Sequence, residues 1–153
     1  MIRKSKKAMI LCIVLLCINL AVIWGNSLLP GEISGAFSRW VKELLGFATD
    51  GEDGGHGLLR KIAHFTEFSC LGLILSWLVR MLRRETVAHF LLPLTAGFLA
   101  ACVDETIQCF VPDRGPGIKD VGIDTAGVAF GVMIMAVWMQ VRIRKRSKKE
   151  MNV

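Results

Sequence analysis

Four long apolar segments restrict what this chain can fold into. They cover about residues 8–24, 62–80, 88–110 and 121–141. Each approaches the length of roughly 20 residues that an α-helix needs to cross a bilayer. In a chain of 153 residues that is 53% hydrophobic, too little polar sequence remains to cover four such segments in water. The sequence therefore favours an all-α membrane protein, a four-transmembrane-helix bundle in one domain over 1–153, above a soluble helical core.

The first apolar segment follows the basic stretch "RKSKK", which is also how a signal peptide begins. The stretch after Trp24, "GNSLLPGEISG", does not place small residues at the usual cleavage spacing. We therefore expect the first segment to remain as an uncleaved span.

The distribution of basic residues predicts the orientation of the spans. Segments 1–7, 80–87 and 142–153 hold 13 of the 19 lysine and arginine residues. Because cytoplasmic flanks carry the excess of these residues, both termini are predicted to be cytoplasmic in a multi-pass protein. The net charge of +6 is then an orientation signal, with attraction to anionic lipid, and does not indicate nucleic-acid binding.

The first outer loop, residues 25–60, is predicted to contain an amphipathic helix. Within "SGAFSRWVKELLGFA", apolar side chains recur on one face at Phe37, Trp40, Val41, Leu44 and Ala48. Such a helix lies in the outer interface or against the bundle. The acidic stretch "DGEDGGHG" after it reads as a flexible connector in which His56 is solvated.

Ionisable and polar residues crowd the predicted outer ends of the last three spans. Because charges in hydrocarbon are costly, they should be paired and should face the bundle interior or a wet cleft. Within helices, Asp104 and Gln108 share a face, as do Asp120 and Asp124, because each pair is four residues apart. The candidates for a binding site at this layer are Lys61, His64, Glu67, Asp104, Glu105, Gln108, Arg114, Asp120 and Asp124.

This charged layer has two interpretations. In a salt-bridged clamp, Lys61 and Arg114 pair with the acids and hold helix ends together. In a functional pocket, His64 and Glu67 are candidates for acid/base catalysis, and Arg114 holds a phosphate or carboxylate bidentately. Carboxylates at 104, 105 and 124 offer oxygen ligands to a divalent cation, but no ligand spacing supports a metal site and none is assigned.

The remaining motifs point to packing. Gly127 and Gly131 form a G-x-x-x-G pattern, for which close helix packing is a sufficient explanation. No catalytic triad order, zinc signature or phosphate-binding glycine loop is present, so no cofactor is assigned and an enzyme is less favoured. The five cysteines lack metal-ligand spacing and read as packing residues: Cys12, Cys17, Cys70, Cys102 and Cys109.

Three sequence blocks resemble the VanZ-like family of small bacterial membrane proteins. They are "KIAHFTEFSCLG" (Lys61–Gly72), "DETIQCFVPDR" (Asp104–Arg114) and "KDVGIDTAGVAFG" (Lys119–Gly131). The family typically has Gly where this chain has Asp113, and it often has Asn where this chain has Asp124. The resemblance implies a protein of the bacterial cell envelope, because the founding member is linked to low-level resistance to teicoplanin, a glycopeptide that acts on cell-wall precursors.

Three functions follow from the residues and the resemblance together. The first is a binding module whose outer pocket engages a lipid head group, a lipid-linked cell-wall precursor or a lipoglycopeptide. The second is a membrane enzyme that acts on such a lipid or antibiotic, with His64 and Glu67 as acid and base. The third is a structural or accessory subunit whose charges only hold helices together.

Overall fold

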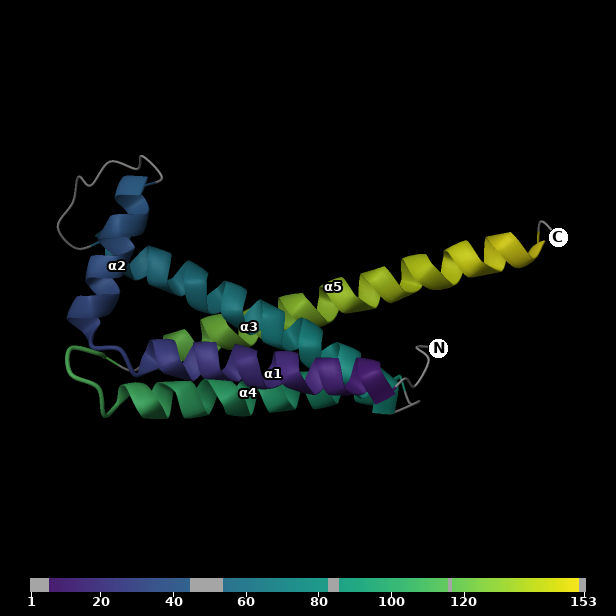
Figure 1. Cartoon of the computed structure of the whole chain (residues 1–153), viewed down its shortest axis with the longest axis horizontal. Helices are drawn as coiled ribbons and strands as arrows, with labels where there is room; N and C mark the ends of the chain where they lie inside the picture. Colours follow the sequence, from purple (N-terminus) through teal and green to yellow (C-terminus); the bar gives the residue numbers. More distant parts are fainter. Residues whose placement is uncertain (1–5, 45–53, 83–85, 116, 152–153) are drawn as a thin grey trace.

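The computed structural model describes residues 6–44, 54–82, 86–115 and 117–151. Within these ranges the chain is helical with no strand. Five helices follow one another: α1 (Lys6–Ser27), α2 (Gly31–Leu44), α3 (Gly54–Leu82), α4 (Ala88–Gln108) and α5 (Ile118–Met151). Helices α1, α3, α4 and α5 form the bundle, and α2 runs across one end of it (Figure 1).

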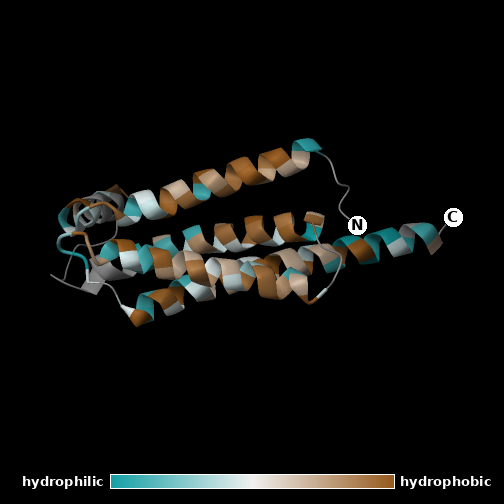
Figure 2. Cartoon of the chain, turned by 90° about the horizontal axis from the view of Figure 1, so that it is seen from below, coloured by the Kyte–Doolittle hydropathy of each residue, from teal (hydrophilic) through white to brown (hydrophobic). Residues whose placement is uncertain are grey.

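Four helices are long and apolar enough to cross a membrane, which confirms the predicted all-α, four-span architecture. The candidate spans are Lys6–Ser27, Leu59–Leu82, Ala88–Gln108 and Ile118–Lys148. The third span, predicted to end at about residue 110, is helical to Gln108, and the next residues, Cys109 and Phe110, lie in a turn. Apolar stretches run along the spans in Figure 2, and many of their large hydrophobic side chains are exposed, as a lipid-facing surface requires.

The chain passes up and down through the bundle. Both termini lie at one end, and α2 lies at the other (Figure 1). We call the latter the α2 end: α1 and α4 finish there, and α3 and α5 begin there. Helix α5 has 34 residues, so it is roughly 51 Å long at 1.5 Å per residue. Its basic C-terminal part extends beyond the other helices (Figure 1).

Two glycines allow α5 to pack closely on α3. A Cβ atom on Gly127 would lie 2.6 Å from the Phe65 carbonyl oxygen, and one on Gly131 would collide with the Ser69 carbonyl oxygen. No larger residue fits at these positions without moving a backbone, which confirms the predicted packing role of the G-x-x-x-G pattern. Because His64 precedes Phe65 directly, this contact also brings α3 and α5 together where the polar side chains lie.

The bundle core is small and draws on all four spans. It consists of the buried residues Ile23 in α1, Phe68 and Leu71 in α3, Ala101 in α4, and Val128 and Val132 in α5. These residues lie three to eight positions, or about one to two helical turns, from the buried polar residues Ser27, His64, Asp104 and Asp124 on the same helices, so the apolar core is directly beneath the polar layer.

Helix α2 confirms the amphipathic helix predicted in the first loop, although the helix begins earlier, at Gly31. Its first residue is fixed to the α4–α5 loop, because the Gly31 N–H donates to the Pro112 carbonyl at 3.3 Å. Ala48 and the side chains of Phe37 and Val41 lie outside the part of the chain that the structure describes.

The predicted flexible connector is wrong over its last four residues. Helix α3 begins at Gly54, so His56 lies in its first turn, and its side chain is not among those described. Glycines disfavour a helix, but once a long apolar helix has formed, each further residue at its end adds a hydrogen bond without a new nucleation cost.

Candidate functional site

A buried polar cluster lies at the α2 end, and every spanning helix contributes to it. Its members are Ser27 from α1, His64 from α3, Asp104 and Gln108 from α4, and Asp124 from α5, and none is more than 7% exposed. The up-and-down topology explains this meeting, because the last turns of α1 and α4 reach the same level as the first turns of α3 and α5.

Asp104 is bonded through both of its carboxylate oxygens. Its Oδ1 accepts a hydrogen bond from the Ser27 hydroxyl at 2.6 Å, and its Oδ2 accepts one from the Gln108 amide at 2.8 Å. The same amide lies 3.3 Å from the Ser27 hydroxyl oxygen. The predicted shared face of Asp104 and Gln108 is confirmed, and the two donors fix the orientation of the Asp104 carboxylate.

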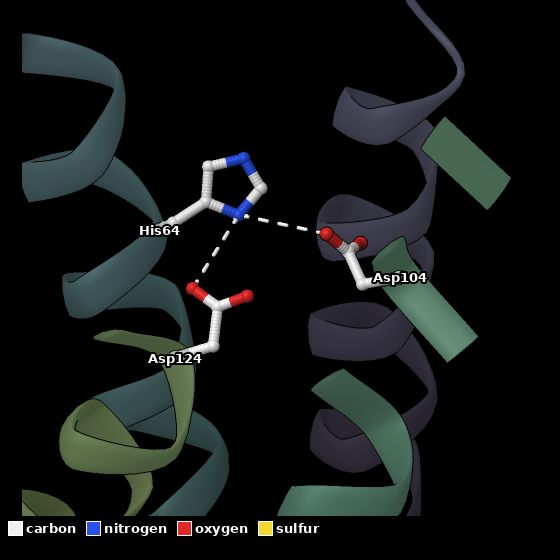
Figure 3. A group of neighbouring side chains, drawn as sticks. All are labelled: His64, Asp104 and Asp124. Carbon is white, nitrogen blue, oxygen red and sulfur yellow. Dashed lines mark ion pairs between the residues drawn. The ribbon is translucent and has the colours of Figure 1, made fainter. Parts of the chain in front are cut away.

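His64 points between two carboxylates (Figure 3). Its Nδ1 lies 3.7 Å from Asp104 Oδ2 and 3.9 Å from Asp124 Oδ1, which is too long for a hydrogen bond to either. His64 Nδ1 and Asp124 Oδ2 are buried without a hydrogen-bond partner among the described residues. One ligand atom from each of the three side chains lies within 4.8 Å of the others. Three groups that prefer a cation or a proton donor therefore converge on one point.

Glu67 lies deeper along α3 and does not join this convergence. Its Oε1 accepts a hydrogen bond from the Asn26 amide at 2.7 Å, and its backbone carbonyl accepts one from the Asn19 amide at 3.3 Å. The structure therefore does not pair His64 with Glu67 as the predicted acid and base. Asp104 and Asp124 are the carboxylates beside the imidazole instead.

Glu105 stabilises the start of α5. It is buried, and its Oε2 accepts a hydrogen bond from the Gly117 N–H at 2.8 Å, immediately before the first residue of the helix. A carboxylate at this position satisfies an N–H that has no partner within the helix and interacts favourably with the helix dipole. Asp104 and Glu105 are neighbours in sequence, but their side chains point about 100° apart. Asp104 therefore bonds to α1 and Glu105 to the start of α5.

Arg114 stabilises the end of α1. Its Nε donates to the Leu29 carbonyl at 3.1 Å, and its Nη2 donates to the Asn26 carbonyl at 2.8 Å. A cation suits a helix C-terminus, where carbonyl groups have no partner within the helix. Burial lowers the pKa of the Arg114 guanidinium below its usual range, and the positive charge of Arg60 acts in the same direction. An arginine nevertheless stays protonated in proteins, so the charge remains.

The salt-bridged clamp is not formed as expected. Within the described part of the chain, neither Lys61 nor Arg114 forms an ion pair with a carboxylate; the ion pairs found there are those of His64. Arg114 binds backbone carbonyls, and the Lys61 side chain is exposed. The α2 end is therefore tied together by hydrogen bonds at helix ends. Bidentate anion binding by Arg114 remains untested, but it would compete with the two bonds to α1.

The loop between α4 and α5 holds Arg114 in place through one unusual backbone conformation. Asp113 has a φ of 57°, in the left-handed region that glycine adopts most readily. Aspartate tolerates this region better than most residues. A glycine at this position would adopt the conformation without strain.

A small cavity opens beside the cluster at the α2 end. Its volume of about 10 Å³ leaves room for roughly one water molecule. It is lined by Arg60, Lys61, His64, Glu105, Gln108, Asp120, Ile123 and Asp124. The two basic residues are partly or fully exposed at its rim, whereas His64 and Asp124 are buried at its floor. Of the predicted site residues, Glu67, Asp104 and Arg114 do not line it.

The sequence interpretation missed the contributions of α1 and of Arg60. Ser27 binds Asp104, Asn26 binds Glu67, and Asn19 binds the α3 backbone. A polar residue inside an apolar span, such as Asn19, is a signal in itself, because it needs a partner in the bundle. No comparable signal marks Ser27, which closes the span and reads as part of the loop.

Comparison with known proteins identifies the family. No curated protein and no solved structure matches the chain. A family model described as VanZ/LLP1 matches residues 8–139, from the start of α1 to the middle of α5. This range includes every polar residue of the α2 end described above and most of the chain. The chain therefore belongs to the VanZ/LLP1 family.

Proposed function

We propose that this protein lies in the bacterial cytoplasmic membrane and binds the phosphate group of an envelope lipid at its α2 end. Family membership supports a membrane protein linked to teicoplanin resistance. The shared chemistry of the ligand is a lipid-borne phosphate, from a phospholipid head group or from a lipid-linked cell-wall precursor.

The distribution of charge supports an outward-facing α2 end. Segments 1–7, 80–87 and 142–153 hold 13 of the 19 basic residues. They include or adjoin the start of α1, the end of α3 and the end of α5, which are the helix ends away from the α2 end, so the positive-inside rule puts both termini in the cytoplasm. A cysteine replacing the exposed Phe110, in a variant without native cysteines, should react with an impermeant thiol reagent added to whole cells. Labelling only after lysis would reverse this orientation.

The observation that carries the proposal is the pair of basic residues at the rim of the cavity. Arg60 and Lys61 line it and form no ion pair with a carboxylate of the described residues. Unpaired cations beside a membrane surface attract phosphate groups, and a guanidinium can bind two phosphate oxygens at once. Because the cavity holds only about one water molecule and its floor is acidic, the phosphate would sit at the rim.

An apolar groove suits the hydrocarbon part of such a lipid. It lies between α1, α3 and α4, and its lining includes Leu16, Leu20, Leu99 and Val103. Its upper residues, Trp24 and Val103, are one to three positions from Ser27 and Asp104 in sequence, so the groove begins just beneath the polar cluster. A lipid whose phosphate is at the α2 end could place an acyl chain there.

The test compares two variants in nanodiscs and in cells. Arg60→Gln with Lys61→Gln removes both rim cations, whereas Lys119→Gln removes an exposed cation that does not line the cavity. We expect the double variant to bind a phosphate-bearing lipid at least 10-fold more weakly and to lose any teicoplanin resistance, while the control retains both. Phosphatidylglycerol and an undecaprenyl-diphosphate-linked precursor are titrated separately to distinguish the two sources. Equal binding by wild type and the double variant would overturn the proposal.

A further inference from the structure

We propose that His64, Asp104 and Asp124 form a binding site for one divalent transition-metal ion, of the Zn²⁺ or Mn²⁺ type. The three side chains come from α3, α4 and α5, and each is buried. This inference goes beyond the binding of a lipid phosphate and stands on other residues than the rim cations.

The spacing of the ligand atoms fits a metal ion. His64 Nδ1 is 3.7 Å from Asp104 Oδ2 and 3.9 Å from Asp124 Oδ1, and one ligand atom from each residue lies within 4.8 Å of the others. Ligand atoms about 2.1 Å from a tetrahedral zinc ion are roughly 3.4 Å apart. The two distances to His64 Nδ1 therefore need to shorten by only a few tenths of an ångström, within the reach of side-chain rotation, and the ligand atoms of the two aspartates lie within 4.8 Å of each other.

Two buried atoms without partners point to a ligand independently of the spacing. His64 Nδ1 and Asp124 Oδ2 have no hydrogen-bond partner in the described structure, and their residues are 7% and 1% exposed. Both side chains are aimed at the space between α3, α4 and α5 (Figure 3). Buried polar atoms are nearly always bonded, so unbonded atoms on two neighbouring buried side chains need an explanation. The Asp124 oxygen nearest to His64 Nδ1 is the other one, Oδ1, so a cation bound by Nδ1 and by either oxygen of this carboxylate would give both side chains a partner.

No basic side chain in the described structure neutralises the two aspartates directly. Arg114 directs two of its nitrogens to the carbonyls of Asn26 and Leu29, and the rim cations Arg60 and Lys61 form no ion pair. Two ionised carboxylates buried close together are strongly unfavourable unless a proton or a positive charge neutralises one of them. A divalent ion supplies that charge where the protein does not.

The donor set selects among metals. One imidazole nitrogen and two carboxylate oxygens suit zinc, manganese or ferrous iron, whereas calcium and magnesium prefer sites made of oxygen alone. The Ser27 hydroxyl and the Gln108 amide orient Asp104, as groups around metal sites commonly orient the ligands. The site depends on a carboxylate at position 124.

The position of the site suggests how such an ion would be used. His64 and Asp124 form the floor of the cavity that opens at the α2 end. Three protein ligands leave a tetrahedral ion one open position, which is the arrangement of catalytic rather than structural zinc sites. The cavity beside His64 and Asp124 has room for the one water molecule that such an open position would take.

The experiment measures metal binding by the full-length protein in detergent, without added lipid. Metal-free protein is titrated with Zn²⁺, Mn²⁺, Mg²⁺ and Ca²⁺, and bound metal is counted by elemental analysis. We expect about one equivalent of Zn²⁺ or Mn²⁺, and at least 10-fold weaker binding in His64→Gln and Asp124→Asn. Co²⁺ loading should give visible absorption without a thiolate charge-transfer band, which excludes binding by the five cysteines.

Glu105→Gln is the matched control, because it removes a nearby buried carboxylate that already has a bond to Gly117. It should bind metal as wild type does, and added metal should raise the melting temperature of both but not of Asp124→Asn. Binding that is substoichiometric, or equal in wild type and Asp124→Asn, would overturn the inference. Metal binding that survives Arg60→Gln with Lys61→Gln while lipid binding is lost would separate this inference from the proposed function. Lipid binding that survives Asp124→Asn while metal binding is lost would separate them as well.

Discussion

The middle of the bundle and its α2 end are held together by different interactions. In the middle, α3 and α5 touch backbone to backbone at Gly127 and Gly131, and the core side chains are apolar. At the α2 end, polar side chains bond to helix ends, as Arg114 does to α1 and Glu105 does to the start of α5. In lipid, where apolar burial drives little association, close packing and hydrogen bonds are the two means available.

The comparison separates structural from functional polar groups at the α2 end. Arg114, Glu105 and Asp104 have hydrogen bonds that join one helix to another. His64 Nδ1 and Asp124 Oδ2, in the same layer, have none among the described residues. The bonded groups account for the stability of this end. Arg114 Nη1 is unbonded as well, but the other nitrogens of its side chain are bonded. Among the described residues the side chains of His64 and Asp124 have no hydrogen bond, so a ligand is the better explanation for these two.

The largest effect on stability is expected from Arg114→Ala. It removes two charge-assisted hydrogen bonds to the carbonyls of Asn26 and Leu29, worth roughly 2–4 kcal/mol together. The melting temperature in detergent and the amount of protein in the membrane should both fall. Arg114→Lys should fall less, because an ammonium can still reach one carbonyl. Full stability of Arg114→Ala with a loss of lipid binding would show instead that Arg114 contacts the ligand.

A smaller loss is expected in the middle of the bundle from Gly131→Val. The new side chain would collide with the Ser69 backbone and push α5 away from α3, at a cost of about 1–3 kcal/mol for overpacking. Gly122→Ala is the control, because a Cβ there has nothing within 4 Å. It should leave the melting temperature unchanged or raise it slightly, since alanine favours a helix. Equal melting of both variants would mean that the helices are not in close contact.

The architecture of this protein could be predicted from sequence because it depends on the hydropathy of each segment and on the regular spacing of side chains along a helix. Hydropathy located the four spans, and their alternating direction brought the charged ends of the last three into one layer. Side chains four residues apart share a face on any helix, so the link between Asp104 and Gln108 needed no tertiary structure.

The partners of individual groups could not be predicted in this way. Arg114 binds carbonyls at the end of α1, and every residue carries a carbonyl, so no residue type marks the target. Ser27 and Asn26 are short polar residues at a span end, where the sequence shows no periodicity. The pairing of His64 with Asp104 and Asp124, rather than with Glu67, depends on how far each helix is rotated about its axis.

The smallest effect on stability, and the sharpest test of the comparison, is expected from Asp124→Asn. The amide has nearly the same shape as the carboxylate and removes a buried charge that lies near Asp104. The melting temperature of the metal-free protein should therefore change by no more than the equivalent of about 1 kcal/mol, or should rise.

Function should respond in the opposite way to stability. If the unbonded groups serve a ligand, Asp124→Asn should lose metal binding and any teicoplanin resistance at normal membrane abundance, whereas Arg114→Ala should lose resistance only in proportion to lost protein. Both quantities are measured on the same two variants. A fall in melting temperature for Asp124→Asn as large as that for Arg114→Ala, with resistance that follows abundance in both, would make Asp124 a structural residue. The division between bonded and unbonded groups at the α2 end would then carry no functional meaning.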